Sequence, residues 1–221
     1  MAGCSQCKSP QHEFAIAMAF QPIVDAAGNS VWGYEALIRW NRPGYDLVMP
    51  GDFIDIAEQS MVVNDIGRWC IHEACRAAAT WDSHLSVSVN LSARQFLDPK
   101  LYGDVRDALR RSGLAPERLE LEITETAIIQ NIQVAVTLLE KFKLLGVKIA
   151  LDDFGTGYSS MRFVQQLPFD RIKIDKSFVL AMETDPKSFA IVDAILRLGH
   201  SLSIPVVAEG VETEAQALRL L

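Results

Sequence analysis

Two adjacent carboxylates, Asp152 and Asp153, end an apolar run that begins at Val147 and leads into a glycine-rich turn. The run is typical of a buried strand, and its alternation sends Asp152 to the face away from the packed helices. Two carboxylates this close repel each other unless one is protonated or a cation lies between them. The pair therefore predicts a site for a hard divalent cation, with a loop that only caps a helix as the alternative.

Further oxygen donors occur where other predicted strands end. In the segment 31–40, alternation places Glu35 and Arg39 on one face and the aromatic Trp32 and Tyr34 on the other. An internal salt bridge is the alternative interpretation of this pair. The candidates that strand ends and alternation supply together are Glu35, Asn90, Glu122, Asp152, Asp153 and Glu209, with a single lysine, Lys173.

The donor set indicates the class of metal. All of the candidate ligands are oxygens, with no histidine or cysteine, which suits Mg²⁺ or Mn²⁺ rather than zinc, and their number suits two ions. Two such ions about 3.5–4 Å apart polarise a phosphoryl oxygen and activate a water for in-line displacement. Phosphodiester hydrolysis is the leading chemistry. An acidic site with a lysine could instead stabilise an enediolate during proton abstraction, so the residues alone leave both open.

The elements that position these residues alternate between strand and helix. The strand candidates lie at residues 16–25, 31–40, 85–90, 119–123, 147–152, 170–175 and 204–209, and the main helices at 62–80, 101–111, 132–145 and 188–200. The first two strands are separated by a hairpin turn, so they should be antiparallel, and the others parallel. Polar inner and aliphatic outer faces predict a TIM-type β/α barrel, an α/β fold whose sites lie at the carboxyl ends of the strands.

The strand count falls short of a complete barrel. Barrels of this type close with eight strands and are typically about 250 residues long. We therefore expect a C-terminally shortened barrel that lacks its last strand, and weak turnover, because Glu209 would lie on an unpaired edge.

Composition limits the classes of partner and location. The chain of 221 residues is 49% hydrophobic and 22% charged, which suits one globular domain. Its net charge of −7 argues against binding to a nucleic acid polymer or an anionic membrane. We expect a cytoplasmic protein, because we see neither an apolar run of about 18 residues nor a signal sequence.

The cysteines fit a reducing compartment. Residues 1–13 are expected to form a flexible leader before the domain at 14–221. In it, Cys4, Cys7 and His12 could supply three soft metal ligands, although a structural zinc site needs four. Cys70 and Cys75 are interpreted as small core residues.

Several motifs, in order, resemble those of the EAL-domain cyclic di-GMP phosphodiesterases. They are FQPI at 20–23, EAL at 35–37 followed by Arg39, NLS at 90–92, EITE at 122–125, DDFGTG at 152–157, IKID at 172–175 and EGVE at 209–212. The resemblance extends from about residue 14 to the end. It implies hydrolysis of cyclic di-GMP to the linear dinucleotide pGpG in bacterial second-messenger signalling. The alternative is a weak or inactive cyclic di-GMP receptor that acts through a protein partner.

The resemblance also implies a role for each site residue. Four of them would bind one metal ion: Glu35, Asn90, Glu122 and Asp152. Asp152, Asp153 and Glu209 would hold the second ion, and Glu209 has also been interpreted as the general base. Lys173 would orient or activate the attacking water. Glu125 would anchor a mobile loop at residues 153–160.

Substrate and partners follow in the same way. The residues implied to contact the substrate are Gln21, Leu37, Arg39 and Asp175, with Arg39 on a phosphate. Mg²⁺ or Mn²⁺ should support turnover and Ca²⁺ should inhibit it. A homodimer is expected, linked to the site through the loop at 153–160. The family's final strand, with a Gln-Gly pair, does not occur in this chain.

Overall fold

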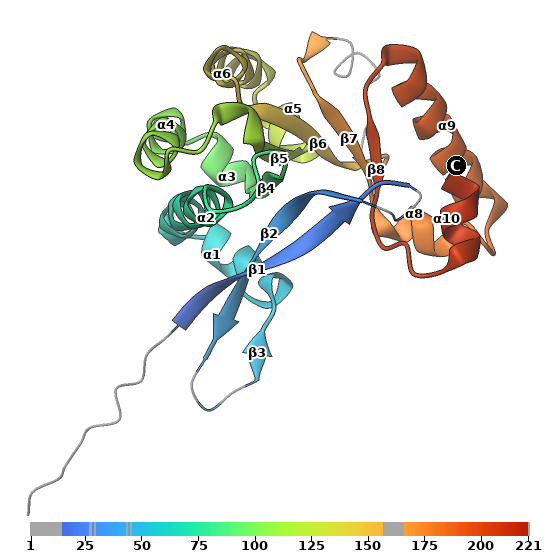
Figure 1. Cartoon of the computed structure of the whole chain (residues 1–221), viewed down its shortest axis with the longest axis horizontal. Helices are drawn as coiled ribbons and strands as arrows, with labels where there is room; N and C mark the ends of the chain where they lie inside the picture. Colours follow the sequence, from blue (N-terminus) through green and yellow to red (C-terminus); the bar gives the residue numbers. More distant parts are fainter. Residues whose placement is uncertain are drawn as a thin grey trace, which may run out of the picture.

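The computed structural model describes residues 15–26, 28, 30–42, 44, 46–156 and 166–220, and its centre is one curled sheet (Figure 1). The strands are β1 (Ala15–Val24), β2 (Val31–Asn41), β3 (Leu47–Val48), β4 (Ser86–Leu91), β5 (Leu119–Thr124), β6 (Lys148–Phe154), β7 (Arg171–Ile174) and β8 (Val206–Ala208). Their order is β1-β2-β4-β5-β6-β7-β8, and β3 pairs beside β2. β1 and β3 run antiparallel to β2. The neighbouring pairs β2–β4, β4–β5, β5–β6, β6–β7 and β7–β8 are all parallel. The predicted antiparallel first strand is confirmed.

Helices connect the parallel strands and cover the outer face of the sheet (Figure 1). They are α1 (Ile54–Glu58), α2 (Val62–Ala78), α3 (Ala93–Phe96), α4 (Leu101–Ser112), α5 (Glu125–Gln130), α6 (Ile132–Leu145), α8 (Lys176–Ala181), α9 (Pro186–Leu202) and α10 (Glu214–Leu220), with 3-10 turns at Pro50–Asp52 and Pro116–Arg118. The ends of α4 and α6 lie where the sequence predicted them. Gly113 and Gly146 cap these helices with φ of 73° and 96°, a left-handed conformation that favours glycine.

The core lies between the sheet and this helical layer. Leu121 and Ile123 of β5 and Ile149 of β6 are fully buried and alternate with inward-facing polar residues. Burial of such aliphatic side chains is worth about 1.5–3 kcal/mol each. Because a slip of one residue would exchange the two faces, the apolar outer face fixes which side chains point into the barrel.

The sheet is a half-barrel rather than a closed one. In the described residues β1 pairs with β2 alone and β8 with β7 alone, so the two ends of the seven-strand path do not meet. This confirms the prediction of a TIM-type α/β barrel with seven strands along its path, since the two-residue β3 only pairs beside β2 in the described residues. The short elements β3, α1, α3, α5, α8 and α10 were not predicted, because two to seven residues carry too little periodicity.

One side chain of β2 departs from the predicted alternation. The register between β1 and β2 shifts so that Ile23 pairs with Gly33 and Val24 with Val31, which leaves Trp32 as a bulge residue. Its ring lies over the Arg171 guanidinium, 3.8 Å from ring centre to Cζ, and not with Tyr34, which packs on Trp81. A bulge changes the local direction of a strand, so the prediction of an outer face for Trp32 is wrong.

Two predicted features lie outside the described residues. The first is the leader with Cys4, Cys7 and His12, and the second is most of the loop expected at 153–160. In the part of the chain that the structure describes, no helix is long and apolar enough to cross a bilayer.

Candidate active site

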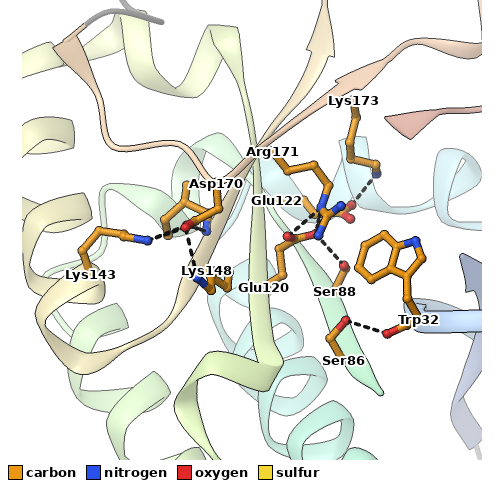
Figure 2. A network of polar contacts seen from close by, with 11 residues as sticks. Trp32, Ser86, Ser88, Glu120, Glu122, Lys143, Lys148, Asp170, Arg171 and Lys173 are labelled. Atoms are coloured by element: carbon orange, nitrogen blue, oxygen red, sulfur yellow. Dashed lines mark hydrogen bonds and ion pairs between the residues drawn. The ribbon is translucent and has the colours of Figure 1, made fainter. Parts of the chain in front are cut away.

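The ammonium of Lys173 lies at the centre of a cluster of carboxylates at the carboxyl ends of the strands. Its Nζ is 2.5 Å from Glu122 and 2.6 Å from Glu209. It is 3.4 Å from Asp152 and 3.7 Å from Glu35. Figure 2 shows Lys173 of β7 reaching across β6 to Glu122 of β5. The structure therefore brings together side chains that are far apart in the sequence, as the strand-end pattern predicted.

Asn90 joins this cluster through Glu35. Its side-chain amide donates a hydrogen bond of 2.7 Å to Glu35 Oε1. Glu35 pairs in register with Ser88, and Asn90 pairs with Glu122, so the strands are staggered. In a barrel the strands are tilted and staggered, so residues that are not paired with each other, such as Glu35 and Asn90, lie at the same height along the barrel axis.

A bulge explains how two consecutive aspartates serve one site. A regular strand would send Asp152 and Asp153 to opposite faces. The β6–β7 register shifts between Leu151 and Phe154, and Asp153 has a φ of 54°, in the left-handed region that asparagine and aspartate tolerate best. Its backbone N–H donates to Asp152 Oδ1 over 2.9 Å. This backbone conformation leaves both carboxylates at the end of the strand, close enough for the charge of Asp152 to raise the pKa of Asp153.

Burial and mutual repulsion raise the pKa of several of these carboxyl groups. Burial raises the pKa of Glu122 well above its usual value, with added repulsion from Glu35 and Asp152, although Lys173 opposes the shift. Burial also raises the pKa of Glu209, against the attraction of Lys173. The pKa of Asp153 is raised to about 6 by burial and by the charges of Asp152 and Asp175.

The lysine is affected in the opposite sense. Burial alone would lower the pKa of Lys173, since only 2% of the residue is exposed. The attraction of Glu122, Asp152, Glu35 and Glu209 exceeds this penalty and raises its pKa. Lys173 is therefore a positively charged hydrogen-bond donor at neutral pH and cannot act as a base.

The residues present fit a hard divalent cation by their chemistry. The Glu122 carboxylate is fully buried, and its Oε1 has no hydrogen-bond partner, which is costly unless a cation satisfies it. The other candidate ligands, Glu35, Asn90, Asp152, Asp153 and Glu209, all carry carboxylate or amide oxygens. As they stand, no three His, Cys, Asp or Glu side chains of the described chain are arranged to hold an ion. The Lys173 ammonium lies among the carboxylates and satisfies part of their charge.

The residues expected to bind substrate lie around this cluster. Gln21 of β1 pairs directly with Glu35, so the two side chains share a face. Leu37 and Arg39 continue that face of β2, and Arg39 donates to the carbonyl of Ile38 over 2.9 Å. Asp175 follows β7 and caps α8 by accepting from the Ser177 backbone N–H.

Glu125 begins α5 at the end of β5. It is 7% exposed, and Thr124 caps the helix by accepting from the Ala127 backbone N–H. The residues that Glu125 was predicted to anchor, from 157 onward, lie outside the described chain, so the anchoring role stays a prediction.

A pocket of about 540 Å³ follows the end of β4 and was not anticipated. It is lined by Glu58, Met61, Asn64, Ala93, Arg94, Leu97, Asp98 and Pro99. Arg94 donates to the Glu58 carbonyl, and Asn64 donates to Asp98 over 2.8 Å while its own Oδ1 is buried without a partner. Arg94 and Leu97 lie in and after α3, a four-residue helix too short to show a periodic pattern in the sequence.

Comparison with known proteins gives consistent matches. The model of the EAL domain family matches residues 10–221. An uncharacterized signaling protein of Caulobacter vibrioides is 49% identical over 201 residues, covering 91% of this chain and 25% of that protein. The bifunctional diguanylate cyclase/cyclic di-GMP phosphodiesterase MucR of Pseudomonas aeruginosa is 41% identical over 205 residues, 91% of this chain and 30% of MucR. The chain thus spans less than a third of either relative.

Solved structures agree with this. The PaMucR phosphodiesterase in complex with c-di-GMP superimposes with a TM-score of 0.89 at 40% identity, covering 93% of this chain and 85% of that one. The FimX EAL domain of Pseudomonas aeruginosa bound to c-di-GMP gives 0.84 at 25% identity, over 93% and 84%. Both were solved with the same cyclic dinucleotide.

Proposed function

The chain belongs to the EAL domain family, and on this premise we propose that it is a metal-dependent phosphodiesterase that hydrolyses cyclic di-GMP to pGpG. One water adds to one of the two phosphodiester groups, and the P–O3′ bond breaks. The product carries one 5′-phosphate and one free 3′-hydroxyl. The role in bacterial second-messenger signalling is part of the same proposal.

The observation that carries this proposal is the cluster around Lys173. Carboxylates of β2, β5 and β6, and Glu209 after β8, lie within 3.7 Å of one ammonium, and Glu122 keeps a buried oxygen without a partner. A purely structural ion pair would leave no such oxygen, because burial without a partner costs about 1–3 kcal/mol. The unpartnered oxygen and the surrounding carboxylates support the proposal that this cluster binds cations and, through them, a phosphate.

Each residue then has a proposed role. Glu35, Asn90, Glu122 and Asp152 would hold one Mg²⁺ or Mn²⁺, and Asp152, Asp153 and Glu209 a second. When bound, the ions supply charge that stabilises the attacking and leaving oxygens. Asn90 now donates its amide to Glu35, so its side chain would have to turn to present oxygen.

Lys173 and Glu209 would act on the water and the phosphate. Because Lys173 is protonated, it would orient the water as a donor and stabilise negative charge developing on phosphate oxygens. Glu209, with its raised pKa, can accept the proton of the water or serve as a ligand. Arg39 would pair with the phosphate, and Gln21, Leu37 and Asp175 would contact the rest of the nucleotide.

The proposal is tested by separating nucleotide products by chromatography. The parent should release pGpG with Mg²⁺ or Mn²⁺, and Glu35→Ala should lose turnover, whereas the exposed Asp65→Asn should retain it. Ca²⁺, which coordinates more loosely, should support binding but not turnover. Equal cleavage by parent and Glu35→Ala would refute the assignment. Binding by the parent with no product in Mg²⁺ or Mn²⁺ would instead favour the receptor function.

Two further parts of the proposal concern assembly and location. We expect a homodimer, which light scattering would check, and a monomer with full activity would refute it. We propose the cytoplasm as the location. Cys70 and Cys75 are free buried thiols, which supports a reducing compartment.

A further inference from the structure

A second charged layer lies inside the half-barrel, directly below the proposed metal ligands. Arg171 Nε donates to both oxygens of Glu120, at 2.9 and 3.2 Å, and Ser88 donates to Glu120 over 3.0 Å (Figure 2). The Glu120 side chain is 3% exposed and that of Arg171 is 19% exposed. The inside of a barrel is usually filled by branched aliphatic residues, so a charged layer there needs a reason.

Each member of this layer precedes a site residue by two positions on the same strand. Ser88 precedes Asn90 on β4, Glu120 precedes Glu122 on β5, and Arg171 precedes Lys173 on β7. Residues two apart on a strand share a face. The upper pair Glu122–Lys173 and the lower pair Glu120–Arg171 therefore connect the same two strands at successive levels.

Both pairs pass over β6, which lies between β5 and β7 in the sheet. Arg171 pairs in register with Ala150, whose methyl group leaves space for a long side chain to cross. Above the guanidinium, the Trp32 ring stacks at 3.8 Å, because the bulge in β2 turns it inward. Arg171 is thus fixed on two sides, by a carboxylate and by an aromatic face.

We propose that Arg171 and Glu120 form a positioning pair that sets the separation and curvature of β5 and β7, and so holds Glu122 and Lys173 in the geometry that ion binding requires. The inference rests on the proposed function only in taking Glu122 as a metal ligand. Displacement of one ligand by about 1 Å can cost about 100-fold in rate, so a connection one level below the site is sufficient to matter.

The competing explanation is that Arg171 only neutralises Glu120. Both explanations predict that removal of one partner destabilises the protein, because the other is left as a buried unpaired charge. They differ for the double variant Arg171→Met with Glu120→Met. An apolar pair of similar volume often restores stability, but it cannot reproduce the charged hydrogen bond by which Arg171 Nε joins both oxygens of Glu120 and so connects β7 to β5.

The experiment measures Mn²⁺ affinity by calorimetry and the melting temperature by circular dichroism, without substrate. Arg171→Met should lower both. The double variant should recover the melting temperature and still bind Mn²⁺ about 10–100-fold more weakly than the parent, as outer-shell changes do. Arg171→Lys, which keeps the charge but not the planar group that stacks on Trp32, should bind Mn²⁺ with intermediate affinity.

The matched control is Lys143→Met. Lys143 of α6 pairs at 2.6 Å with Asp170, the residue before Arg171 (Figure 2). This ion pair connects the helical layer to the strand and lies outside the barrel interior. Its loss should not weaken Mn²⁺ binding more than twofold. The inference is overturned if the double variant binds Mn²⁺ within twofold of the parent, or if the parent binds no Mn²⁺. If the double variant does not fold, Arg171→Lys decides, and binding of Mn²⁺ by this variant within twofold of the parent overturns the inference. A parent that binds Mn²⁺ but releases no pGpG would refute the proposed function alone.

Discussion

Replacement of Lys173 by methionine should destabilise the metal-free protein strongly. The residue is 2% exposed, and its ammonium is the cation among four carboxylates at 2.5–3.7 Å. Removing one partner of a buried ion pair typically costs about 3–5 kcal/mol. A domain of this size loses about 2–4 °C of melting temperature per kcal/mol, so the expected loss is roughly 6–20 °C.

The loss should depend on pH and on metal. Carboxylates without the ammonium can be relieved by protonation, so the destabilisation should be larger at pH 8 than at pH 5. A divalent cation at 100 times its dissociation constant stabilises by about 2.7 kcal/mol. Because no ammonium then competes for the same oxygens, Mn²⁺ should raise the melting temperature of Lys173→Met more than that of the parent.

The assay is thermal unfolding by circular dichroism in a chelator and in saturating Mn²⁺. Lys148→Met is the matched control, since Lys148 is half-exposed and pairs with Asp170 at 3.3 Å. It should change the stability by less than about 0.5 kcal/mol. If Lys173→Met melts within 2 °C of the parent in chelator at pH 8, the lysine is not the internal counterion of this site and the reasoning fails.

Two further predictions concern the strand ends. The pKa of Asp153 is raised to about 6 in the folded state. Between about pH 4 and 6 the folded protein therefore binds more protons than the unfolded chain. The contribution of this group to stability is lost as pH rises through that window. Asp153→Asn should therefore become more stable relative to the metal-free parent from pH 4 to 6 in urea titrations, and a constant difference would contradict this. Gly33→Ala should cost about 1–3 kcal/mol, because its Cβ would lie 2.9 Å from the Ser86 carbonyl oxygen and separate β2 from β4. Gly103→Ala, in the open on α4, should instead stabilise by up to about 1 kcal/mol, and equal melting temperatures for the two variants would refute the packing argument.

The sequence was sufficient where long periodic segments face a single core. The burial of Leu121 and Ile149 follows from period-two alternation, and the meeting of Glu35 and Glu122 around Lys173 follows from parallel strands. The ends of α4 and α6 follow from the glycines that cap them. The layer of Glu120 and Arg171 was visible as alternation but not as a pair, because only the strand order shows that β5 and β7 lie on either side of β6. The pocket beside α3 depends on a four-residue helix that carries no period of its own.

Two side chains in and below the site, those of Asp153 and Trp32, are placed by breaks in the regular alternation of β6 and β2. A perfectly alternating β6 could give the barrel only one of its two aspartates, and a perfectly alternating β2 would send Trp32 outward to the helices. In each strand one bulge residue changes this, Asp153 with φ of 54° and Trp32 between the paired Val31 and Gly33. The first bulge places a second carboxylate beside Asp152, and the second places an aromatic face against Arg171 below it. Since positive φ at a residue other than glycine costs about 1–3 kcal/mol, the conformation of Asp153 fits selection for the charge it places at the site rather than for stability.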